Sequence, residues 1–161
     1  MSSTNNVAFT APINPPGARP VITPEQTWKG LLLKIRSAET FVPGAIQSTR
    51  VVSESIDSLT GNAVTVREVL FRETQKKVLE TVTAFEPARV DFDQPNGSKI
   101  SNVISQGAGG ELYMTYIFEW RHPGVSEVEL AELLEKEKKM SQAAVEGTIK
   151  VLRQLVEEKK L

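Results

Sequence analysis

The C-terminal segment 126–159 most constrains the fold, because its pattern predicts one long helix. Apolar and small residues recur along it at helical spacing and form one broad face: Leu130, Leu133, Leu134, Met140, Ala144, Val145, Thr148, Ile149, Val151, Leu152, Leu155 and Val156. Ser126 and Glu129 have the spacing of a capping box. At ~1.5 Å per residue the helix would be roughly 45–50 Å long. Its apolar face therefore needs a large partner.

The middle of the chain supplies that partner as a series of strands. Six segments have strand length and are rich in Val, Ile, Thr, Phe and Tyr: 46–55, 63–73, 77–85, 89–93, 99–105 and 111–121. Residues 7–13 fit a further, first strand. Turn sequences such as Asn96-Gly97 separate most of the segments. Because the links are short, neighbouring strands are predicted to be antiparallel.

A shorter helix is predicted after the first strand. Thr23 is a candidate cap, Pro24 would be the first helical residue, and Gln26 completes a second capping box. Apolar residues follow at helical spacing as far as Ile35, and a short turn is expected at 38–41.

This order predicts an α+β helix-grip fold. A curved antiparallel sheet of six to seven strands would wrap around the long C-terminal helix, with short helices after strand 1. We expect one domain over residues 1–161, in which residues 1–6 form a flexible N-terminus.

Composition excludes several classes of function. The formal net charge is −1, which gives no electrostatic footprint for nucleic acid. The absence of cysteine excludes disulfides and thiolate metal ligands. The sequence contains no apolar run of the ~18 residues that a membrane helix needs, and the N-terminus lacks a secretory pattern. A cytoplasmic protein is predicted, and its oligomeric state is left open.

Three stretches carry a resemblance to a known family: "TWKGLLLKIRSAETFVPG", "NGSKISNVIS" and "GELYMTYIFEWRH". They resemble the AtaL-like family of the SRPBCC, or START-like and birch-pollen-allergen-like, helix-grip superfamily. The resemblance extends from Phe9 over nearly the whole chain. Fungal members of that family are often encoded beside genes of secondary metabolism. The superfamily includes lipid carriers, receptors and polyketide cyclases, so the fold alone does not choose a function.

The strand at 111–121 has an alternating apolar stripe that would face the long helix. Small residues in the middle of that helix, with Gly147 among them, would either interdigitate with the stripe or leave a void. Spacing alone favours a plain core, whereas the family resemblance favours a pocket for an apolar ligand. The predicted ligand-binding residues are Asn102, Leu112, Met114, Phe118, Trp120, Met140, Ala144 and Thr148.

Three residues are candidate catalytic groups. Glu80 shares a face with Val78 and Val82, and Glu68 shares one with Val66 and Leu70. A carboxyl group in an apolar pocket has a raised pKa and can act as a general acid or base. The alternative is that these carboxylates face solvent or pair with an arginine. Tyr116, on the inward stripe, would orient a carbonyl group or simply bond within the core.

Two other features have plainer interpretations. His122, the only histidine, precedes Pro123-Gly124 and is interpreted as a turn residue. The basic residues Lys29, Lys34 and Arg36 would allow the first helix to touch an anionic membrane, but burial of its apolar face in the fold is the simpler interpretation.

Two functions from different classes fit these observations. One is a cofactor-independent cyclase, isomerase or dehydratase of secondary metabolism, acting on a hydrophobic natural-product intermediate without a metal. The other is a non-catalytic carrier of a lipid or metabolite. A weaker third possibility is a protein-interaction domain. In the first two cases the partner is a hydrophobic small molecule, with no nucleic acid and no stable membrane insertion.

Overall fold

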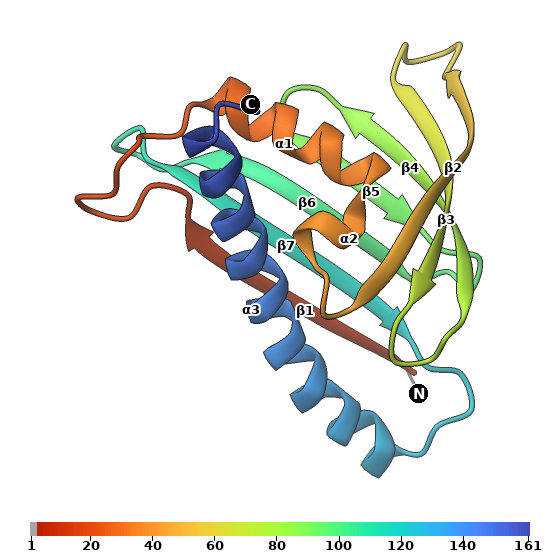
Figure 1. The fold of residues 1–161 in the computed structure, drawn as a ribbon. Coiled ribbons are helices and arrows are strands. Elements are labelled where there is room, and N and C mark those ends of the chain that lie inside the picture. Colours follow the sequence, from red (N-terminus) through yellow and green to blue (C-terminus); the bar gives the residue numbers. More distant parts are fainter. Residues whose placement is uncertain (1–2) are drawn as a thin grey trace.

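The computed structural model describes residues 3–161 as one seven-stranded antiparallel sheet, three helices and their links (Figure 1). The elements in chain order are β1 (Thr4–Pro12), α1 (Pro24–Arg36), α2 (Ala38–Phe41), β2 (Ile46–Ile56), β3 (Ala63–Phe71), β4 (Lys77–Phe85), β5 (Arg89–Asp93), β6 (Lys99–Gln106), β7 (Leu112–Arg121) and α3 (Glu127–Glu157). The strand order is β1-β7-β6-β5-β4-β3-β2. The predicted helix-grip fold is confirmed.

Both predicted helix starts are present in full. The Thr23 hydroxyl accepts a hydrogen bond from the backbone N–H of Gln26, and the Gln26 side chain bonds back to Thr23. Ser126 and Glu129 make the same reciprocal pair at the start of α3. Each box satisfies two N–H groups that a helix end otherwise leaves unbonded.

The N-terminal strand begins earlier than the sequence pattern predicts. Residues 4–6, expected to belong to a flexible N-terminus, pair with residues 119–121 of β7. Residues 1 and 2 lie outside the described part of the chain. The early start brings Asn5 onto the inner face of the sheet, where it is buried. The first strand is therefore an edge of the sheet next to the last strand of the chain.

The core lies between the inner face of the sheet and the C-terminal half of α3. Alternate residues of β7, from Leu112 to Phe118, are buried there against Val145, Ile149 and Leu152 of the helix. The N-terminal half of α3 is mostly exposed and runs past the end of the sheet core (Figure 1). Within residues 3–161, no helix has the length and apolar character needed to cross a membrane.

Candidate functional site

Helix α1 carries a lysine into the interior of the molecule. Lys34 lies on the face that also buries Thr27, Leu31 and Ile35, and its side chain is only 6% exposed. The interpretation of Lys34 as a basic residue facing a membrane surface is therefore wrong for this residue. It differs in this respect from Lys29, which is exposed.

The amine of Lys34 lies among groups from three strands. Its Nζ donates a hydrogen bond to Oδ1 of Asn102 on β6, at 2.9 Å. It lies 4.8 Å from the ring centroid of Phe92 and 5.0 Å from that of Tyr116. Burial, followed by the positive charge of Arg67, lowers the pKa of Lys34 from 10.5 to about 7, against the opposing effect of Glu80. Near neutral pH, a large fraction of this amine is therefore uncharged.

The amide of Asn102 holds a second donor in the same place. Asn102 is fully buried, and its orientation is fixed because the oxygen must accept the hydrogen bond from Lys34. Its Nδ2 has no hydrogen-bond partner among the described residues. A buried donor left unpaired costs about 1–3 kcal/mol, and such groups in native structures often mark a functional site. A ligand oxygen placed beside Lys34 would satisfy it.

Glu80 lies inside the sheet, but its carboxylate is fully engaged. Arg67, directly opposite on β3, bonds Oε1 through Nε at 3.0 Å and Nη2 at 2.8 Å. Gln94 donates to Oε2 at 3.0 Å. The Nη1 of Arg67 also bonds the backbone carbonyls of Lys34 and Ile35, at 3.0 and 2.9 Å. The pair thus anchors the end of α1 to the sheet, as one of the alternatives for Glu80 anticipates.

Glu68 lies on the opposite, outer face of the sheet. Its carboxylate is 3.5 Å from Arg50 and 3.8 Å from Lys77, and it is part-exposed. Since residues alternate along a strand, the inward position of Arg67 places Glu68 outward. Glu68 is therefore not brought together with the other candidate residues.

Tyr116 and Thr148 do meet across the core. The Tyr116 hydroxyl donates to Oγ1 of Thr148 at 2.7 Å, linking β7 to α3. Burial raises the pKa of Tyr116, so the phenol stays protonated. Its hydroxyl is thus a neutral group with one partner already in place.

The remaining predicted ligand-binding residues divide into two groups. Leu112, Met114 and Phe118 are buried in the core. Trp120 stacks on Phe118 with ring centroids 5.5 Å apart. Ala144 is half-buried against the same core, whereas Met140 is 40% exposed. The inner face is thus closely packed at its centre and more open toward the N-terminal half of α3.

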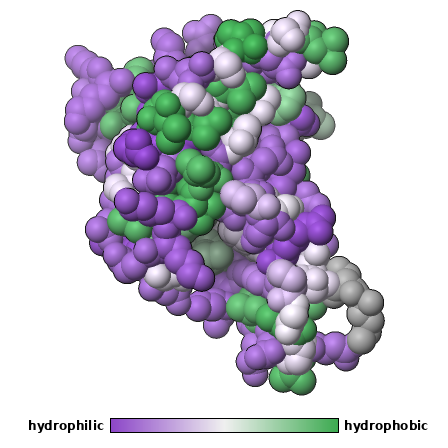
Figure 2. Space-filling model, turned by 90° about the vertical axis from the view of Figure 1, so that its right-hand side faces the viewer, coloured by the Kyte–Doolittle hydropathy of each residue, from purple (hydrophilic) through white to green (hydrophobic). Residues whose placement is uncertain are grey.

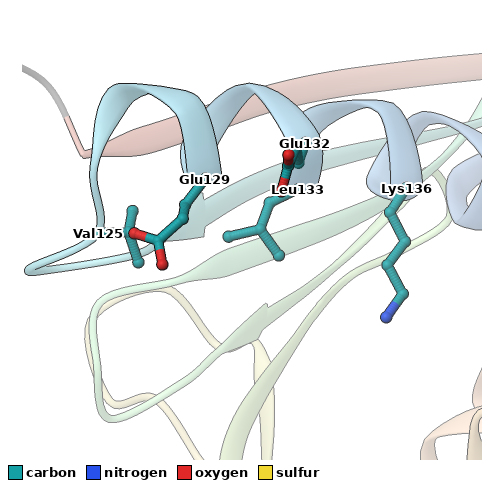
Figure 3. Close-up of a pocket in the computed structure, with 5 residues that line it drawn as sticks. All are labelled: Val125, Glu129, Glu132, Leu133 and Lys136. Atoms are coloured by element: carbon teal, nitrogen blue, oxygen red, sulfur yellow. The ribbon is translucent and has the colours of Figure 1, made fainter.

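Two surface hollows mark where the packing opens. One, of about 340 Å³, lies along α3 and is lined by Val125, Glu129, Glu132, Leu133 and Lys136 (Figure 3). The other, of about 400 Å³, lies beside β4 and the β5–β6 turn, and Gln94 is part of its lining. Figure 2 shows apolar side chains around a hollowed part of the surface. Neither hollow is lined by Asn102, Tyr116 or Thr148. The expected cavity is thus open at its end and filled at its centre.

His122 has a structural role that the sequence analysis missed. Its ring bonds the carboxylate of Glu137, a buried residue of α3, and Asn5 donates to the same carboxylate at 2.9 Å. Asn5 also donates to the carbonyl of Leu130 at 3.0 Å. These contacts hold the N-terminal half of α3 to β1 and to the end of β7. Within residues 3–161, no group of three or more His, Asp or Glu side chains is placed to hold a metal ion.

An antiparallel sheet that closes on a long C-terminal helix, with short helices after its first strand, defines the birch-pollen-allergen-like helix-grip class. The chain belongs to the AtaL family, described as acetylaranotin biosynthesis cluster protein L, whose model matches residues 7–159. A search of curated proteins finds no match.

Solved structures with the same fold share little sequence with this chain. The 18 kDa protein CC1736 from Caulobacter crescentus has a TM-score of 0.66 at 16% identity, over 94% of this chain and 97% of that one. The Zhui aromatase/cyclase from Streptomyces sp. R1128 has a TM-score of 0.59 at 16% identity, over 95% and 96%. Ara h 8.0201 has a TM-score of 0.54 at 14% identity, over 96% and 99%.

Proposed function

We propose that the protein binds an apolar small molecule that carries a carbonyl group, between the sheet and α3. We further propose that it acts there as a cofactor-independent cyclase, isomerase or dehydratase of natural-product metabolism, in the cytoplasm. The observation that carries the proposal is the unpaired Nδ2 donor of Asn102 beside the buried amine of Lys34.

The chemistry follows from these two groups. A carbonyl oxygen accepting from Asn102 Nδ2 would lie next to Lys34 Nζ. The uncharged amine can then remove a proton from the carbon adjacent to the carbonyl, and the two N–H donors stabilise the enolate oxygen. Lys34 therefore replaces Glu80 as the preferred base, since the carboxylate of Glu80 is held by Arg67.

The comparisons support this proposal at the level of class. The family description refers to a biosynthesis cluster, and one protein of the same fold is an aromatase/cyclase. These likenesses favour a small molecule of biosynthetic origin, whereas the choice of reaction rests on the residues.

Deuterium exchange of a simple apolar ketone tests the proposal. Binding of α-tetralone is first followed by Trp fluorescence, because Trp120 borders the open end of the core. Exchange at its α-carbon in D₂O is then followed by proton NMR. We expect acceleration by the wild type and by Lys29→Met and Glu68→Gln, and none by Lys34→Met.

Two outcomes would count against the proposal. Saturable binding without exchange would favour the alternative, a non-catalytic carrier. Failure of the folded protein to bind α-tetralone or any related apolar ketone would contradict both functions.

A further inference from the structure

We propose that Lys34 is a nucleophile that forms an imine with an aldehyde or ketone ligand. This inference rests on the proposed function, because it requires a ligand on the inner face of the sheet. It goes further by assigning the ligand class and a covalent step to one nitrogen atom.

The partners of Lys34 set it apart from a lysine buried in an ion pair. Its hydrogen bond goes to a neutral amide, that of Asn102. The nearby carboxylate of Glu80 is taken by Arg67 and Gln94 instead. Within residues 3–161, Lys34 is in no salt bridge. A buried amine beside a second cation is the arrangement that favours the nucleophilic, uncharged form.

The surrounding groups match the needs of each step. The nitrogen lone pair attacks the carbonyl carbon, and the C=O π electrons move to the oxygen, which accepts a hydrogen bond from Asn102 Nδ2. A proton passes from nitrogen to that oxygen to give a carbinolamine. The nitrogen lone pair then forms C=N, and the hydroxyl leaves with the remaining N–H proton as water. The products are one imine and one water, and no oxidant or reductant is required.

Aromatic rings would stabilise the imine after it takes up a proton. The faces of Phe92 and Tyr116 already lie 4.8 and 5.0 Å from the nitrogen. A cation at this distance from a ring is attracted by the π electrons, by up to about 2 kcal/mol when it is desolvated. Exclusion of bulk water also slows hydrolysis of the imine.

The sheet offers an apolar route to this nitrogen. Asn102 and Tyr116 are paired neighbours in one row across the sheet, and the next row toward the open end holds Ile100, Phe92 and Phe118. Trp120 follows on β7, at the end of the sheet where the hollow along α3 lies. An apolar aldehyde entering there would meet carbon surface until it reached Lys34.

Reductive trapping tests the inference. The full chain is incubated at pH 7 with cinnamaldehyde and sodium cyanoborohydride, and adducts are located by intact mass and peptide mapping. A pKa of about 7 gives roughly a thousandfold more uncharged amine than an exposed lysine has at this pH. We expect one adduct at Lys34, formed more than about tenfold faster than any adduct at Lys29, because limited access offsets part of that advantage.

The controls separate this inference from the proposed function. Lys34→Arg keeps a cation but should lose the fast adduct, while Lys29→Arg should keep it, and circular dichroism checks that both fold. Urea-unfolded protein should lose the preference for Lys34. If cinnamaldehyde quenches Trp fluorescence but labels all lysines alike, the imine is wrong and ligand binding stands. If neither cinnamaldehyde nor cinnamyl alcohol binds, the proposed function fails as well.

Discussion

At the residue scale, the placement of Lys34 has a thermodynamic consequence. The folded residue titrates at about pH 7, whereas the unfolded one titrates near its ordinary value of 10.5. Between these values the unfolded chain binds more protons at this residue, so the free energy of unfolding rises with pH. Below pH 7 both states are protonated, and the folded state bears the full cost of the buried charge.

Lys34→Met should therefore stabilise the protein most at low pH. We expect a gain on the order of 3 kcal/mol at pH 6 that shrinks toward pH 10, since one pKa unit corresponds to about 1.4 kcal/mol and the bond to Asn102 is lost. Urea unfolding at pH 6, 8 and 10 measures it. Lys29→Met, at an exposed lysine, should show a pH-independent difference. Parallel curves for the wild type and Lys34→Met would contradict the burial of a neutral amine.

The sequence contains a signal for Lys34, but a weak one. The residue follows Leu31 by three positions and Thr27 by seven, so helical spacing places it on the buried face. A lysine at such a position commonly extends its charge to solvent, and only the tertiary structure shows that the amine reaches Asn102. The pairing of Arg67 with Glu80 was easier to anticipate, because both residues alternate with apolar neighbours on adjacent strands.

At the element scale, two glycines report how α3 is packed. A Cβ on Gly30 of α1 would lie 2.7 Å from Cδ1 of Leu152, a buried residue of α3. A Cβ on Gly147 of α3 would lie 3.7 Å from the carbonyl oxygen of Phe41, which is ordinary contact. The close approach that the sequence suggests for Gly147 is therefore found at Gly30 instead.

The two alanine substitutions should have opposite signs. Gly30→Ala gains helix propensity but forces Leu152 to move, so we expect a net loss of about 1 kcal/mol. Gly147→Ala should gain up to about 1 kcal/mol, because no atom must shift. Thermal and urea unfolding measure both. A stabilised Gly30→Ala would mean that α1 is free to move away from α3.

The sequence predicts elements better than it predicts their packing. The bounds of β4 and β5 follow the alternating pattern and its turns without error. The start of β1 was missed because residues 4–6 are polar and are held by pairing with β7, 115 or more positions away in the chain. The role of Glu137 was hidden for a similar reason, since its partners His122 and Asn5 come from other elements.

At the scale of the whole molecule, the open end is bounded by α3 and the β3–β4 turn. Lys136, which lines the hollow along α3, bonds Glu73 of that turn at 3.0 Å. Both side chains are well exposed, so the pair adds little to stability. It does connect the N-terminal half of α3 to the far side of the sheet. The filled centre of the core requires a ligand to displace packed side chains, and movement of this half-helix would give it room.

Lys136→Ala should therefore change ligand entry more than stability. We expect the free energy of unfolding to change by less than about 0.5 kcal/mol, and the association rate of cinnamaldehyde to rise severalfold, because the half-helix opens more often. Stopped-flow Trp quenching measures the rate. Lys139→Ala, at an exposed lysine of the same helix, is the matched control and should leave it unchanged. Equal rates in both variants would place the entrance elsewhere, and the hollow beside β4 and Gln94 would become the route to test.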